Sequence, residues 1–290
     1  MRRIPESELI INSDGTIFHL HLKPSEIADT IILVGDPGRA DLISTFFDTK
    51  EFSRASREFN TITGTYNNKR ITVISTGIGC DNIDIVITEL DALANVDFET
   101  RMVKEEKKSL RIMRLGTCGA VQPDIPVGSM ILSHISVGCD GLLNWYADRD
   151  EISFKEMEDA FVKELNWPRQ LPIPYFAKAH PEMIALFEKE TVKGVTISAS
   201  GFYGPQGRVV RLPLALPNML EDFEKFRFED WRITNFEMEG SAIAGLSAKL
   251  GHKAATMCVA IANRHLKESK PDYKEFVKKM ILVALNKLCA

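Results

Sequence analysis

Apolar, strand-like runs alternate with helix-like segments along most of the 290-residue chain, and this alternation constrains the fold more than any other feature. The run 30–35 (TIILVG) is typical of a buried strand, and residues 36–47 (DPGRADLISTFF) are typical of a helix. Strands separated by helices of about 10–15 residues favour an α/β sheet. Such sheets are covered by helices on both faces, so we predict an α/β fold of that kind.

The same pattern continues toward the C-terminus. A hairpin is expected where strands 61–65 and 70–75 flank Asn67-Asn68, a dipeptide suited to a tight turn. The other predicted elements are a helix at 83–96, strands at 110–116, 128–138, 193–200 and 232–235, a helix at 237–250, a strand at 253–262 and a helix at 271–288.

Two segments interrupt the alternation. Residues 99–108 (ETRMVKEEKK) form a charge run, which we interpret as the solvated face of a helix. Residues 142–180 contain two of the three tryptophans, Trp145 and Trp167, and we interpret them as an irregular excursion or lid. Neither segment has the composition of a linker, so residues 1–290 are interpreted as a single domain.

Composition excludes several classes of protein. The chain has 36 Lys and Arg against 40 Asp and Glu, whereas a nucleic-acid-binding protein normally carries a basic excess. No run approaches the ~20 apolar residues that span a bilayer, and the basic start lacks the apolar region of a secretory signal. The five cysteines are widely spaced and include no C-x-x-C pair. We therefore expect a cytoplasmic protein with no disulfide framework and no metal site.

Two strand ends combine glycine with arginine. Gly35-Asp36-Pro37-Gly38-Arg39 lies where a strand gives way to a helix, and the free N–H groups there, with Arg39, favour an anion. Arg114 precedes the expected turn Gly116-Thr117-Cys118-Gly119, which adds a hydroxyl and open backbone at a strand end. A third glycine turn, 75–79, could close the same crevice. A simple helix cap at Asp36 and a structural ion pair of Arg114 remain open alternatives.

Two later motifs suit a ring and its hydroxyl groups. In 202–208 (FYGPQGR), Gln206 and Arg208 could read a planar heterocycle, on which Phe202 could stack. In 235–240 (NFEMEG), two carboxylates could accept hydrogen bonds from vicinal hydroxyls. A polar loop without a ligand, and acidic residues that complement a helix dipole, are the alternatives.

His19 is a lone histidine in the apolar segment 17–20 (IFHL), which we interpret as a strand. Taken alone, it indicates a structural residue rather than a site residue.

Read together, the motifs resemble the uridine phosphorylase branch of the hexameric-type nucleoside phosphorylase family. GDPGR, SREF, STGIG, RLGTCGA, FYGPQGR and NFEMEG occur in the family order, between FHL and IANR. The resemblance implies a single-domain, three-layer nucleoside phosphorylase-like fold with a central mixed β-sheet flanked by helices. It also implies phosphate-dependent cleavage of uridine to uracil and ribose 1-phosphate, through an oxocarbenium-like transition state.

The resemblance also implies roles for individual residues. The implied phosphate-binding residues are Gly35, Arg39, Arg57, Arg114 and Thr117. The implied ribose-binding residues are His19, Met238 and Glu239, and the implied base-binding residues are Phe202, Gln206 and Arg208. Catalysis is implied for Arg114, Thr117, Glu239 and Arg208. Positions matching Arg57 and His19 act in the neighbouring subunit's site, which implies a homo-oligomer with sites shared across a dimer interface.

No cofactor is implied, because inorganic phosphate is a co-substrate. Some family members bind a monovalent cation near positions matching Glu58 and Ile78, together with a serine of a Pro-Ser pair. Asp81-Asn82 replace that pair here, which argues against the cation.

Three other functions remain open. A purine nucleoside phosphorylase or a water-using nucleosidase would share the fold, and a non-catalytic nucleoside-binding protein could use the same scaffold. The three arginines at 39, 57 and 114 argue against hydrolysis, since water needs no cationic cradle. Related purine enzymes place an aspartate where this chain reads IANR (261–264), which favours the pyrimidine branch. The sequence decides neither the tolerance for deoxyuridine or thymidine nor the choice between dimer and hexamer.

Overall fold

The alternation in the sequence becomes one large mixed β-sheet in the computed structural model, which describes residues 2–270 and 272–290. The strands run in the order β11-β12-β10-β8-β13-β7-β1-β4-β3-β2, with β9 paired to β8 and β14 paired to β13. Their bounds are β1 Thr30–Val34, β2 Thr49–Ser56, β3 Phe59–Tyr66, β4 Lys69–Ser75, β7 Arg111–Ala120, β8 Met130–Gly138, β9 Tyr175–Lys178, β10 Val192–Ser198, β11 Arg227–Phe228, β12 Trp231–Glu237, β13 Lys253–Asn263 and β14 Glu268–Ser269.

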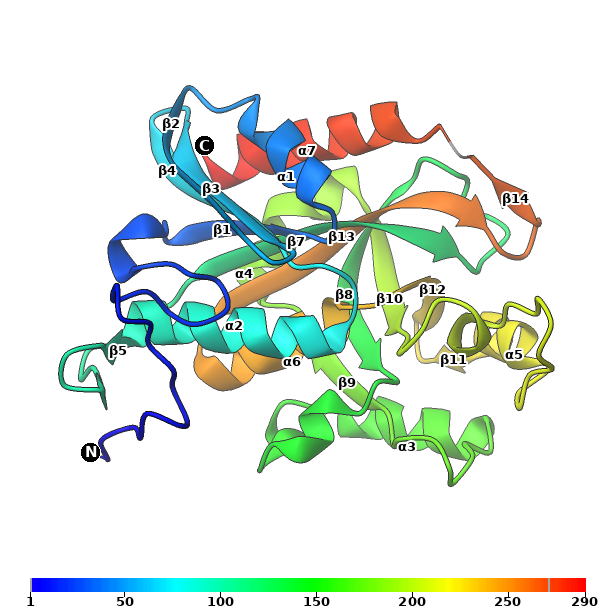
Figure 1. Cartoon of the computed structure of the whole chain (residues 1–290). Helices are drawn as coiled ribbons and strands as arrows, with labels where there is room; N and C mark the ends of the chain where they lie inside the picture. Colours follow the sequence, from blue (N-terminus) through cyan, green and yellow to red (C-terminus); the bar gives the residue numbers. More distant parts are fainter. Residues whose placement is uncertain (1, 271) are drawn as a thin grey trace.

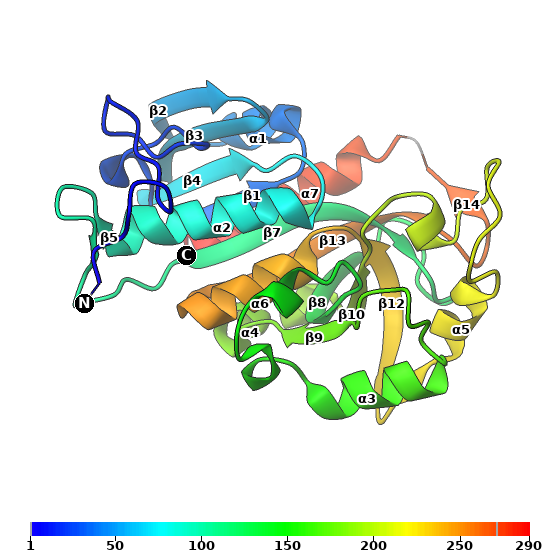
Figure 2. The same ribbon diagram turned by 60° about the horizontal axis from the view of Figure 1, so that its bottom comes forward.

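Helices cover both faces of this sheet (Figures 1 and 2). The helices are α1 Pro37–Ser44, α2 Cys80–Asn95, α3 Lys155–Glu164, α4 Pro181–Phe187, α5 Met219–Lys225, α6 Gly240–Leu250 and α7 Lys274–Leu288. The apolar run of β1 serves both faces: Ile31 and Leu33 pack in the cluster with α2 and α6, while Ile32 packs in the cluster with α1, α4 and α7. The predicted mixed α/β sheet flanked by helices is confirmed.

Local turn chemistry also follows the sequence. Asn67 and Asn68 connect β3 to β4 and have φ values of 49° and 59°, the left-handed conformation that such a tight hairpin turn requires. The predicted hairpin is confirmed. None of the helices within residues 2–270 and 272–290 combines the length and apolarity needed to cross a bilayer.

The charge run 99–108 is not a helix, so that prediction is wrong. Strands β5 (Val96–Asp97) and β6 (Met102–Val103) form a two-stranded hairpin here instead. Arg101, at its turn, is buried and donates through Nε to the main-chain oxygen of Ile4 at 3.0 Å. The tertiary contact with the N-terminal segment therefore decides this conformation.

The segment 142–180 is more regular than predicted. It contains α3 and β9, and β9 extends the sheet by pairing antiparallel with β8. Phe161 of α3 is fully buried in an aromatic cluster with Phe176 and Phe223. Because these aromatic side chains anchor the segment to the sheet, residues 155–164 and 175–178 are regular, where an irregular excursion or lid was expected.

Candidate active site

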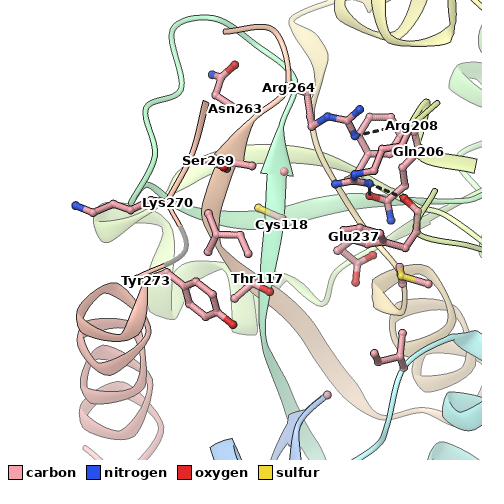
Figure 3. A pocket seen from close by; sticks show the side chains of 18 of the residues that line it. Thr117, Cys118, Gln206, Arg208, Glu237, Asn263, Arg264, Ser269, Lys270 and Tyr273 are labelled. Carbon is pink, nitrogen blue, oxygen red and sulfur yellow. Dashed lines mark hydrogen bonds between the residues drawn. The ribbon is translucent and has the colours of Figure 1, made fainter. Parts of the chain in front are cut away.

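A cavity of about 810 Å³ opens at the carboxyl ends of β1, β7, β12 and β13, the edge where open α/β sheets bind ligands (Figure 3). Segments far apart in the sequence meet there. The lining residues on which the following description depends are Gly35, Asp36, Arg39, Ile78, Arg114, Thr117, Phe202, Gln206, Arg208, Glu237, Met238, Glu239, Arg264 and Tyr273. Ile78 comes from the glycine turn 75–79, which does reach this crevice.

The β1–α1 junction forms one wall of the cavity. Asp36 caps α1 by accepting from the Gly38 amide at 3.0 Å, and Pro37 occupies the first turn. Arg39 donates through Nη1 to the main-chain oxygen of Leu115 at 3.2 Å, which fixes it beside β7. Burial, followed by the charge of Arg114, lowers the pKa of Arg39. Two neighbouring guanidinium groups therefore repel each other, and an anion between them would relieve that repulsion.

Arg114 is buried and lies between two carboxylates. Its Nη2 donates to Glu239 Oε2, and its Nη1 lies 3.4 Å from Glu237 Oε2. Burial opposes the charge of Arg114, but Glu239 and Glu237 outweigh burial and raise its pKa. Arg114 therefore forms the structural ion pair that was left open as an alternative, and it also lines the cavity. Its Nε is buried without a hydrogen-bond partner among the described residues.

The sequence Gly116-Thr117-Cys118-Gly119 is not a turn, contrary to the prediction. β7 continues to Ala120, because β13 runs beside it up to Asn263 and β12 pairs with its last two residues. Gly116 is required for packing instead: a β-carbon there would collide with the Arg114 guanidinium and lie 2.8 Å from Cys258 Sγ. The glycine thus leaves room for Arg114 over the strand.

The two glutamates of NFEMEG have different tasks. Glu237 caps α6, since its Oε2 accepts from the amides of Glu239 and Gly240 at 2.9 Å each. Glu239 faces the cavity and accepts through Oε1 from the amide of Gly79 at 2.7 Å. Burial raises the pKa of Glu239 against the opposing effect of Arg114. Glu237 thus serves the N-terminus of α6, in line with the helix-dipole alternative, and Glu239 remains available to a ligand.

Loop 202–208 lies at the other end of the cavity, with Gln206 and Arg208 side by side (Figure 3). Arg208 donates through Nη1 to Gln206 Oε1 at 2.7 Å, and its Cζ lies 3.8 Å from the centroid of the Phe202 ring. Burial, followed by the charge of Arg264, lowers the pKa of Arg208 to about 10. A preoriented amide and guanidinium are therefore presented beside an aromatic ring.

Arg264 and Tyr273 are among the lining residues that had no assigned role in the sequence. Arg264 donates from Nη1 to the main-chain oxygen of Gln206 at 2.9 Å, and so supports the loop. It is the last residue of the IANR segment (261–264), whose sequence indicated a part of the site but not this contact. Tyr273 precedes α7 and lines the same cavity. No pattern around Tyr273 indicated a site.

His19 and Arg57 do not line this cavity. His19 lies in a turn, not in the predicted strand, because its main-chain N–H and its ring bind the carboxylate of Glu89, with Nδ1 2.6 Å from Oε1. Arg57 Cζ lies 5.8 Å from the centroid of the Phe18 ring, next to His19. The two residues are thus close together, apart from the chain's own cavity.

The phosphorylase superfamily model matches residues 29–289. The chain belongs to this superfamily. The nucleoside phosphorylase of Trypanosoma brucei, described as showing uridine phosphorylase activity, has a similar structure with a TM-score of 0.85. It is 32% identical in sequence, over 97% of this chain and 99% of that one. The predicted family and fold are confirmed.

Other superfamily members differ in the base that their names specify. Uridine phosphorylase of Thermococcus kodakarensis is 28% identical over 87% of this chain and 79% of that protein. Guanosine phosphorylase of Halorubrum lacusprofundi is 26% identical over 84% of this chain and 83% of that protein. Membership of the superfamily therefore does not identify the base of the nucleoside substrate, which depends on the residues of the site.

Proposed function

We propose that this superfamily member is a uridine phosphorylase, which converts uridine and phosphate into uracil and ribose 1-phosphate. One observation carries the proposal: a single cavity has the Arg39–Arg114 pair at one end and the Gln206–Arg208 pair at the other. Glu239 lies beside Arg114 and can hold the sugar that connects the phosphate end of the cavity to the base end. The relatives from T. kodakarensis and T. brucei support the same activity.

The proposed chemistry depends on charge and position. Gly35, Arg39, Arg114 and Thr117 hold phosphate beneath C1′ of the ribose, where its negative charge stabilises an oxocarbenium-like transition state. Met238 and Glu239 fix the ribose, and Glu239 accepts hydrogen bonds from its hydroxyls. Because holding the two substrates together supplies much of the rate, no nucleophilic side chain is needed.

The base end favours uracil. The amide of Gln206 can accept from a ring N–H and donate to a neighbouring carbonyl, while Arg208 stabilises the negative charge of the leaving base. Phe202, which is half exposed, can close over the ring. Purine phosphorolysis is the second candidate, favoured by the similarity to the guanosine phosphorylase.

A second subunit completes the proposed site. His19 and Arg57 lie together outside the chain's own cavity, as expected if they reach the ribose and the phosphate of a neighbouring copy. The proposal therefore includes a homo-oligomer with shared sites. Phosphate is the co-substrate, with no further cofactor, and the cytoplasmic location remains a prediction.

The deciding experiment measures uracil release from uridine with and without inorganic phosphate. A uridine phosphorylase releases uracil and forms ribose 1-phosphate only when phosphate is present. Uracil release at the same rate without phosphate would identify a nucleosidase. Faster phosphorolysis of inosine or guanosine than of uridine would favour the purine enzyme, and binding without turnover would favour a nucleoside-binding protein.

A further inference from the structure

Tyr273 occupies a position in the cavity that none of the proposed roles uses. It immediately precedes α7, and it lines the cavity together with Gly35, Arg39 and Thr117. Its phenol points toward Thr117, whereas the neighbouring Lys270 side chain points away (Figure 3). Tyr273 thus closes the anion end of the cavity from the side opposite the base loop.

The chemistry of the phenol suits this position. The Tyr273 ring packs against the apolar cluster beneath α7, which holds it in place. Its hydroxyl makes no hydrogen bond to any residue of the described ranges 2–270 and 272–290, although a phenol can donate one. Arg39, Arg114 and Thr117 line the same end of the cavity, and the Tyr273 hydroxyl adds a donor there from the α7 side. A tetrahedral anion presents oxygens in several directions, so a donor here would complement the arginines.

We propose that the Tyr273 hydroxyl donates a hydrogen bond to the phosphate co-substrate and so completes its binding site from the α7 side. The inference rests on the proposed function, because it assigns the anion end of the cavity to phosphate. It adds a residue that contacts phosphate and not uridine, because the phenol lies at the anion end, far along the cavity from the Gln206–Arg208 pair.

The Tyr273→Phe variant tests this role because it removes the hydroxyl and keeps the ring. A hydrogen bond to a charged group corresponds to roughly a tenfold or greater change in affinity. We expect the KM for phosphate to rise about tenfold, with the KM for uridine and the melting temperature unchanged. Tyr66→Phe is the matched control, since Tyr66 packs against the same cluster but donates to Asn286 at 2.7 Å.

Calorimetric titration of the wild type and both variants with inorganic phosphate separates this inference from the proposed function. If the wild type fails to cleave uridine but binds phosphate more tightly than Tyr273→Phe does, the function is wrong and the phosphate contact stands. Equal phosphate affinities of wild type and Tyr273→Phe, or no binding by the wild type, would overturn the contact. A rise in the uridine KM alone would also overturn it.

Discussion

The guanidinium of Arg264, at the end of β13, donates to the main-chain oxygens of Gln206 at 2.9 Å and Gly207 at 3.4 Å. The end of a central strand thereby fixes a surface loop that carries the proposed base-reading pair. Gln206 is buried, although Phe202, Tyr203 and Pro205 of the same loop are exposed.

Arg264→Ala should therefore weaken uridine binding. Loss of two hydrogen bonds frees loop 202–208, and we expect the KM for uridine to rise roughly tenfold. The KM for phosphate should change little, because Arg39 and Arg114 remain in place. Steady-state kinetics with each substrate varied in turn would measure both constants. Arg232→Ala is the control, since Arg232 pairs with Asp124 on the surface. An equal effect of both variants would contradict the anchoring role.

Arg114→Ala should abolish phosphate-dependent turnover and also destabilise the fold. Arg114 is buried between Glu237 and Glu239, and removing one partner of a buried ion pair costs about 3–5 kcal/mol. The double variant Arg114→Ala/Glu239→Gln should recover part of the stability without recovering activity, because it removes one of the unpaired charges. Thermal unfolding and uracil release distinguish the two effects. Near-normal activity of Arg114→Ala would refute its role.

Gln206→Ala should change the choice of base. Without the amide, the N–H and carbonyl groups of uracil lose their paired partner, and the kcat/KM for uridine should fall about 10- to 100-fold. The kcat/KM for inosine, whose ring presents a different pattern, should fall less. The ratio of the two values is the measurement. An unchanged ratio would show that Gln206 does not read the base.

The pH dependence of stability should reveal the ion pair of Glu158 in α3. Burial would raise the pKa of Glu158, but hydrogen bonds from Arg149, Ser153 and Lys155 lower it below its ordinary value of 4.5. Because the folded-state pKa lies below the unfolded one, the stabilisation is complete above pH 4.5 and is lost as the pH falls through the folded-state pKa.

The variant Glu158→Gln tests this prediction. Its melting temperature should lie below that of the wild type at pH 7, and the difference should shrink as the pH falls below 4.5. Uridine cleavage at pH 7 should be retained below the melting transition, since α3 does not line the active-site cavity. A difference in melting temperature that stays constant from pH 7 to pH 3 would exclude the ion pair as its cause.

Local features of the fold were predictable because nearby residues determine them. The apolar run 30–34 is buried on both faces as β1, Asp36 caps α1, and Asn67-Asn68 form the left-handed turn. The β5–β6 hairpin (96–103), which includes the first part of the charge run, and the continuation of β7 past Gly116 were not predictable in this way. In both cases, contact with a segment distant in the same chain decides the conformation rather than the local sequence. This segment is the N-terminal one for the hairpin and β13 for β7.

The sequence by itself determined the family, because its motifs keep one order along the chain, and it determined which residue types are available for phosphate, sugar and base. Only the tertiary structure decided how they combine. Arg114 pairs with Glu239, 125 positions away, and Arg264 supports Gln206, 58 positions away. Such contacts depend on the order of strands in the sheet. Tyr273 joins the cavity for the same reason, since α7 packs beside β7 and β13.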